Sequence, residues 1–271
     1  MTFEELRAEI GVELAVIAWH RKGRLDENEG AALGAMTFDE CVSTYNEGSA
    51  DGELRNALHN AMTSKAETFT QWDICWQGSA VGSEQHRLCL EKMADTAGVE
   101  DRATSFAHWK LTWERIQGEE RELRRRVKAG LGQTANSFGE WRDVLNIAQG
   151  DIVLQGQAMA GMNGSAETFR QLRHLSRLLS PDSTMWPDVI DRMCELAESF
   201  DQIRTMLALI RPDDERHDAL LDKLAECRAS PRDWVEVFQN APPGSELARI
   251  AQRNMAKTAR RTVPAVKWNE D

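Results

Sequence analysis

The sequence predicts an all-α protein, a right-handed α-solenoid of about seven 31-residue two-helix repeats behind an N-terminal helical cap. Three observations predict it. A short opening motif recurs at a nearly constant spacing, an apolar pattern of helical period follows each copy, and a Gly- or Pro-containing break stands near the middle of each unit.

The opening motif is Ser or Thr, then Phe or Pro, then two variable residues and a Cys or larger apolar residue. Its first residues define column 1 of each unit: Thr37, Thr68, Ser105, Ser137, Thr168, Ser199 and Ser230. The steps between them are 31, 37, 32, 31, 31 and 31 residues. Such regularity is typical of stacked helical hairpins, each too small to bury its own apolar face.

Column 1 predicts where the first helix of each unit begins, because Ser and Thr are preferred N-cap residues. Column 4 holds Glu, Gln, Asp or His, so four or five units are expected to form a capping box. We assign His108, in column 4 of the third unit, a structural role. Columns 2, 5, 9 and 12 are apolar and predict one buried stripe on a helix of about ten residues.

A break around column 14, as at Gly82, Gly150 and Pro181, ends this helix, and a second helix is expected from about column 16 to column 29. Its column 26 is mostly methionine: Met62, Met93, Gly130, Met162, Met193, Leu224 and Met255. Because large apolar residues recur at helical spacing in every unit, we expect them to form the core rather than a cofactor or peptide groove.

The pattern divides the chain into three parts. Residues 1–36 are an N-terminal helical cap or degenerate repeat that opens with Thr2-Phe3, and residues 37–260 are the tandem repeats of one solenoid. Residues 261–271 are a C-terminal tail, in which Trp268 is expected to be loosely docked or disordered.

Composition excludes several classes of protein. The 271 residues carry a net charge of -11, which opposes general affinity for DNA, RNA or anionic membranes. The five cysteines form no CxxC pair, so we predict buried thiols and no disulfide framework or metal site. The start of the chain is acidic where a secretory signal is basic, and no apolar stretch is long enough to span a membrane; we expect a cytoplasmic protein.

Motifs for catalysis are missing from the sequence. It has no Gly-rich phosphate loop, HExxH, GxSxG or kinase motif, and its six histidines are scattered over several columns. We therefore expect no catalytic residue and no cofactor. The alternative kept here is an accessory subunit of an enzyme.

The pattern over about residues 37 to 260 resembles the tetratricopeptide, HEAT and pentatricopeptide class of helical-hairpin solenoids. Its 31-residue period is shorter than the tetratricopeptide period of about 34, and the W-x-x-L-G-x-x-Y and A-x-x-x-F signature is missing, so no specific family follows. By fold analogy alone, the resemblance implies a protein that binds other molecules.

A ladder of cations is the feature that points to a binding surface. Column 6 carries Lys or Arg in four consecutive units, and in the fifth unit columns 3 and 10 on the same flank are also Arg. The predicted partner-binding residues are Lys110, Arg142, Arg170, Arg173, Arg177 and Arg204. They would hold an acidic segment through forked guanidinium–carboxylate bonds. The alternative is a solvated helix surface, since Lys and Arg favour helices.

Two functions follow from these observations. The first is a non-catalytic scaffold that binds a partner protein or peptide, in one form an acidic segment, along the solenoid. The alternative is a single-stranded nucleic-acid-binding repeat protein of the pentatricopeptide kind, with the cations along the phosphates. The net charge and the lack of paired polar residues in exposed columns argue against the alternative. The partner's identity, the pathway, the binding face and the oligomeric state stay open.

Overall fold

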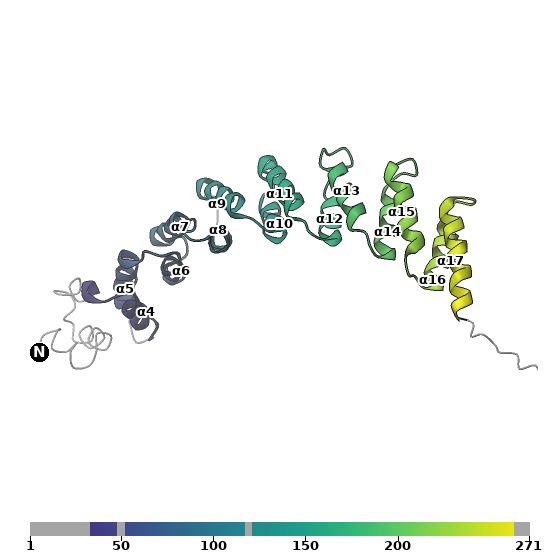
Figure 1. Ribbon diagram of the computed structural model, residues 1–271. Coiled ribbons are helices and arrows are strands. Elements are labelled where there is room, and N and C mark those ends of the chain that lie inside the picture. The colour runs from purple at the N-terminus through teal and green to yellow at the C-terminus, as the bar shows by residue number, and fades with distance from the viewer. Residues whose placement is uncertain (1–32, 48–51, 117–120, 263–271) are drawn as a thin grey trace, which may run out of the picture. The chain divides into compact units, whose positions relative to one another are not determined.

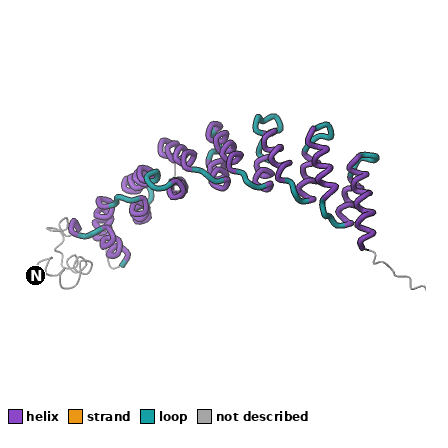
Figure 2. Tube along the Cα trace, in the orientation of Figure 1, coloured by secondary structure: helices purple, strands orange, loops and turns teal. Residues whose placement is uncertain are grey.

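The structure is a computed structural model that describes residues 33–47, 52–116 and 121–262, with side chains up to residue 258. These residues form helices and connecting loops and contain no strand (Figure 2). The predicted cap motif Thr2-Phe3 and the tail residue Trp268 lie outside the described residues. The chain divides into two compact units, residues 1–158 and 159–271.

The helices follow one another in pairs that pack side by side (Figure 1). In the first unit the first helices of the pairs are α4 (Phe38–Asn46), α6 (Phe69–Gly78), α8 (Arg102–Arg115) and α10 (Phe138–Ile147). The second helices are α5 (Gly52–Lys65), α7 (Glu84–Thr96), α9 (Arg121–Thr134) and α11 (Ile152–Ser165), and the division between the units falls within α11.

The second unit continues the same order of helices. Its first helices are α12 (Phe169–Ser176), α14 (Phe200–Leu209) and α16 (Pro231–Asn240). Its second helices are α13 (Trp186–Leu196), α15 (Glu215–Glu226) and α17 (Glu246–Thr262). The predicted all-helical fold is confirmed for the described residues, and its adjacent helix pairs are consistent with helical repeats.

Capping boxes set the start of the first helices, as predicted. In each of six hairpins the column-1 hydroxyl accepts a hydrogen bond from the column-4 backbone N–H, and the column-4 side chain accepts one from the column-1 N–H. The six N-caps are Thr37, Thr68, Ser137, Thr168, Ser199 and Ser230. The number exceeds the four or five expected because Asp233 also completes the box.

The third hairpin is the exception, and here the predicted N-cap is wrong. Helix α8 begins one turn earlier, and its N-cap is Asp101, whose carboxylate accepts hydrogen bonds from the backbone N–H groups of Ala103 and Thr104. Ser105 is buried inside the helix and donates to the carbonyl of Glu100. The role of His108 is structural, but as a ring stacked on Phe69, with centroids 3.8 Å apart, rather than in a capping box.

The buried stripe of the first helices runs along columns 2, 5 and 8. Column 2 is a buried Phe in six hairpins, and column 8 is buried throughout, as at Cys75, Val144 and Met206. The prediction that column 9 belongs to this stripe is wrong, because Tyr45 and most of its equivalents are partly exposed. Columns 8 and 9 lie three and four residues after column 5, and both spacings place a residue near the same helix face. The sequence alone therefore does not choose between them, and packing does.

Column 26 of the second helices is buried in six of the seven hairpins, as predicted for a core position, and Met255 in the seventh is partly exposed. The methionines at 62, 93, 162 and 193 are at most 1% exposed. In α9 the column holds Gly130, and a Cβ there would overlap the indole of Trp109. The large indole thus fills the space that a methionine fills in other hairpins.

Polar contacts join consecutive second helices in the second unit. The column-25 side chains Arg192, Lys223 and Asn254 each donate to backbone carbonyls at the end of the preceding second helix. The acceptors include the carbonyl oxygens of Asn163 at 2.6 Å, Cys194 at 2.9 Å and Ala225 at 3.3 Å. Since the last carbonyls of a helix lack intrahelical partners, each hairpin supplies the C-terminal cap of its neighbour.

The substitution Gly130→Ala is expected to destabilise the protein by about 1–3 kcal/mol, because the new methyl group overlaps the Trp109 indole. The matched control is Gly156→Ala in α11, where a Cβ meets nothing within 4 Å, and it should stabilise by about 0.5–1 kcal/mol. Urea unfolding followed by circular dichroism measures both. Equal effects of the two substitutions would contradict the packing of Gly130 on Trp109.

Candidate partner-binding surface

The structure divides the six predicted binding residues between the two units. Lys110 on α8 and Arg142 on α10 belong to the first unit. Arg170, Arg173 and Arg177 belong to α12 and its C-cap, and Arg204 to α14, all in the second unit.

Two of the six cations join neighbouring hairpins. Lys110 Nζ lies 2.6 Å from Asp143 Oδ2, and Arg204 Nη1 lies 2.7 Å from Glu236 Oε1. In both pairs a column-6 cation meets a column-7 carboxylate of the next first helix. The hydrogen bond to Asp143 raises the pKa of Lys110. The contribution of this pair to stability is thus present below the ordinary lysine pKa and is lost as the pH rises through the raised value.

The three arginines of α12 have a different environment. Arg170, Arg173 and Arg177 are spaced by three and four residues, so they share one flank of the helix, beside the buried stripe that contains Phe169 and Leu172. All three are exposed, and none of their guanidinium groups forms an ion pair or hydrogen bond with another described residue. Helix α12 itself carries no acidic residue. The α12 arginines therefore form a cationic surface without a counter-ion from the described chain.

Helix α9 holds a second group of cations that the sequence analysis did not identify. Its members are Arg121, Arg124, Arg125, Arg126 and Lys128. Arg125 and Arg126 pair with Glu122 and Asp95 at 2.8 and 3.0 Å, and Arg124 and Lys128 both lie over the ring of Trp113 at 5.6 Å. The run E-R-E-L-R-R-R-V-K marks this group in the sequence, but it belongs to a second helix and lies outside the first-helix columns that define the cation ladder.

Column 9 of the first helices supplies aromatic rings at two junctions between hairpins of the first unit. The hydroxyl of Tyr45 donates to the carbonyl of Gly78 in the next hairpin. The guanidinium of Arg115 lies 4.3 Å from the centroid of the Trp76 ring, and its Nε is 3.3 Å from Asp73 Oδ1. An aromatic ring and a polar group thus fill the space between first helices here.

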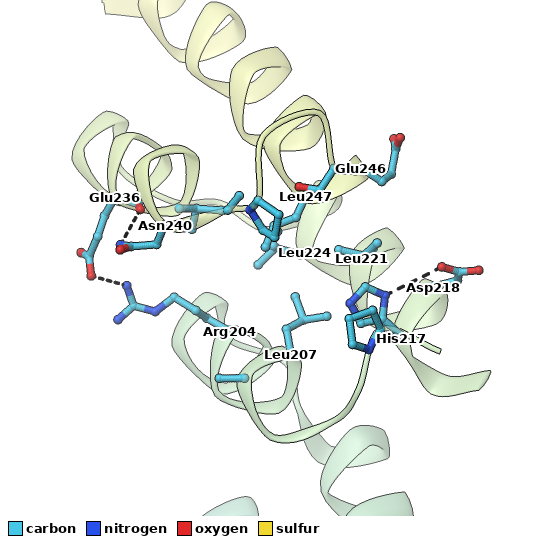
Figure 3. Close-up of a pocket in the computed structure, with 16 residues that line it drawn as sticks. Arg204, Leu207, His217, Asp218, Leu221, Leu224, Glu236, Asn240, Glu246 and Leu247 are labelled. Carbon is cyan, nitrogen blue, oxygen red and sulfur yellow. Dashed lines mark hydrogen bonds and ion pairs between the residues drawn. The ribbon is translucent and has the colours of Figure 1, made fainter. Parts of the chain in front are cut away.

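An open slot lies at the equivalent junction near the end of the chain, between the hairpins α14/α15 and α16/α17 (Figure 3). Its volume is about 660 Å³, within the range of sites that take small molecules or side chains. The apolar walls are Leu207, Ala208, Pro212, Leu221, Leu224, Val237, Ala241, Pro242 and Leu247. The Arg204–Glu236 pair stands at one end, and His217 and Asp218 stand at the other (Figure 3).

Two buried histidines, His59 and His86, contact polar groups of neighbouring helices or loops. His59 Nε2 lies 2.7 Å from the carbonyl oxygen of Cys75, and His86 Nδ1 lies 2.9 Å from Ser79 Oγ. Across the described residues, no group of three or more His, Cys, Asp or Glu side chains is arranged to hold a metal ion. No helix in this part of the chain is long and apolar enough to cross a membrane.

Comparison with known proteins adds no family to this description: no protein-family model, curated protein or solved structure matches the chain.

Burial governs the thiols. Cys41, Cys75 and Cys89 are fully buried, and burial raises the pKa of Cys75 to about 12 and that of Cys89 to about 11. Cys194 and Cys227 are only partly buried. Because the thiolate is the reactive form, none of the three buried thiols is poised for nucleophilic chemistry at neutral pH.

A thiol titration tests this arrangement. With Ellman's reagent at pH 8, Cys194 and Cys227 should react in the native protein, while the other three cysteines react only after denaturation. Mass spectrometry after partial alkylation identifies the protected residues. Rapid labelling of Cys75 in the folded protein would contradict the buried core of α6.

Proposed function

We propose that this chain is a non-catalytic, cytoplasmic interaction protein that binds an acidic segment of a partner protein through the α12 arginines. The observation that carries the proposal is the contrast within the cation ladder. Lys110 and Arg204 meet carboxylates of neighbouring hairpins, whereas Arg170, Arg173 and Arg177 are exposed on one face without a described counter-ion.

The chemistry of arginine supports this choice of partner. A guanidinium group offers five N–H donors in a planar fork that matches a carboxylate, so three of them on one face can orient an extended acidic chain. In a protein of net charge -11, most of the surface repels an acidic partner, so a local cationic surface directs that partner to one place.

The proposal includes the finer architecture. We take the hairpins to be about seven 31-residue repeats of a right-handed α-solenoid, with residues 37–260 as its body. The six capping boxes support it because they recur at the same two columns of six hairpins. The column-25 contacts support it because each joins a second helix to the end of the preceding second helix.

The test is the binding of a fluorescent peptide rich in Glu and Asp, measured by anisotropy at low ionic strength. The triple reversal Arg170→Glu, Arg173→Glu and Arg177→Glu should weaken binding at least about tenfold, since three exposed ion pairs are replaced by repulsion. A matched variant, Arg232→Glu, Arg253→Glu and Lys257→Glu on the last hairpin, makes the same change in net charge and should bind nearly as the unmodified protein does.

Equal affinity of the unmodified protein and the α12 variant for the peptide would contradict the proposal. A labelled single-stranded RNA of mixed sequence serves as the second probe. Tight RNA binding that falls steeply with salt, and that the α12 reversal removes, would instead establish the nucleic-acid-binding function.

A further inference from the structure

The slot between α14/α15 and α16/α17 has a structural origin that other junctions between hairpins reveal. Between α6 and α8, column 9 is Trp76 and column 11 of the following helix is Arg115, which lies over the indole. Between α14 and α16 the same columns hold Leu207 and Asn240, both of which line the slot. The slot therefore occupies the position that an indole and a guanidinium fill in the first unit.

The junction between α4 and α6 supports this reading. There column 9 is Tyr45 and column 11 of the next helix is Gly78, and the phenol reaches the Gly78 carbonyl at 3.1 Å. At both junctions a large residue in column 9 thus contacts the column-11 residue of the next first helix. At the slot neither column is large, because Leu207 is shorter than an indole and Asn240 turns back to donate to the carbonyl of Glu236 at 2.8 Å.

The charge at the mouth of the slot is reversed relative to the filled junction. In the first unit the column-6 residue is Asp73, and it pairs with the cation that lies over the indole. At the slot the column-6 residue is Arg204. A group that took the place of Arg115 would therefore need a negative charge to meet the column-6 side chain.

The other charged groups of the slot leave Arg204 as the anion-binding end. Glu236 holds one nitrogen of the Arg204 guanidinium, and Asp201 lies 3.7 Å from another, which leaves donors of the fork for a second carboxylate. Glu246 is paired with Arg249 at 3.3 Å, and Asp218 lies beside His217 at the opposite end. The column-6 residue of the preceding first helix is the exposed Arg173.

We infer that the slot binds a large apolar side chain of the partner segment, of leucine to tryptophan size, and that a carboxylate adjacent to it in that segment meets Arg204. This inference rests on the proposed function, because it extends the same acidic segment from α12 to α14. Packed helices lie about 10 Å apart, the length of about three extended residues. The acidic residues that meet the α12 arginines would therefore lie about three positions from the apolar residue.

Two peptides test the inference on the full-length protein. Both carry the same run of Glu and Asp and, about three positions further on, a Glu followed directly by Trp in one peptide and by Ala in the other. The Trp peptide should bind about tenfold to a hundredfold more tightly, since a large apolar side chain leaves water. Equal affinities for the two peptides would overturn the slot while leaving the binding of acidic segments intact. If neither peptide bound, the proposed function itself would fail.

A matching variant fills the slot with a side chain of the protein itself. Leu207→Trp places an indole where Trp76 stands in the first unit, so it should abolish the preference for the Trp peptide over the Ala peptide. The control is Leu196→Trp at the end of α13, an exposed leucine outside the slot, which should keep the preference.

A crosslinking measurement needs no variant and stands even if Leu207→Trp does not fold. A peptide with benzophenylalanine in place of Trp is irradiated on the unmodified protein and the product is mapped by mass spectrometry. Adducts at Leu207, Leu221 or Leu247 are expected. Adducts confined to residues outside the slot would overturn the inference.

Discussion

The structure depends on one constraint: a hairpin of two short helices buries its apolar residues only when a neighbouring hairpin covers them. Phe69 shows this, because its ring packs against His108 of the following hairpin, and Phe200 makes the same kind of contact with Trp234. The contacts repeat because six of the seven first helices begin at the same point of their unit, which the capping box sets. Helix α8 begins one turn earlier and still buries Phe106 and Trp109 in the same columns.

The register between successive hairpins decides which cations pair with a carboxylate of the next hairpin and which have none opposite them. A column-6 cation finds a carboxylate where column 7 of the next helix is Asp143 or Glu236. The corresponding residue for Arg173 is Thr205, which has no charge to offer. The exposed α12 arginines and the open slot thus arise in the same way, from positions where the chain departs from the pattern that fills or pairs them elsewhere.

Several features of the fold and the site were predictable from particular residues. Column 1 hydroxyls followed by Gln71, Glu140 or Gln202 predicted helix starts because capping chemistry is local. The prediction that Ser105 is an N-cap was wrong because Asp101 offers a competing cap one turn earlier, and burial of Ser105 favours the longer helix. The sequence predicted the cations of α12, but it did not predict that Lys110 and Arg204 are paired, since their partners lie about one unit away in the sequence.

By itself the sequence determined the helical class, the spacing of the opening motif, the starts of six first helices and the buried phenylalanine and methionine columns, because these follow from periodicity and short-range hydrogen bonds. Only the tertiary structure decided that column 8 is buried throughout and column 9 mostly is not, which cations are paired, and that a slot is open beside Leu207. Each of these depends on the size and charge of a residue in the adjacent hairpin. That information is spread across units, and it acts only once the helices are packed.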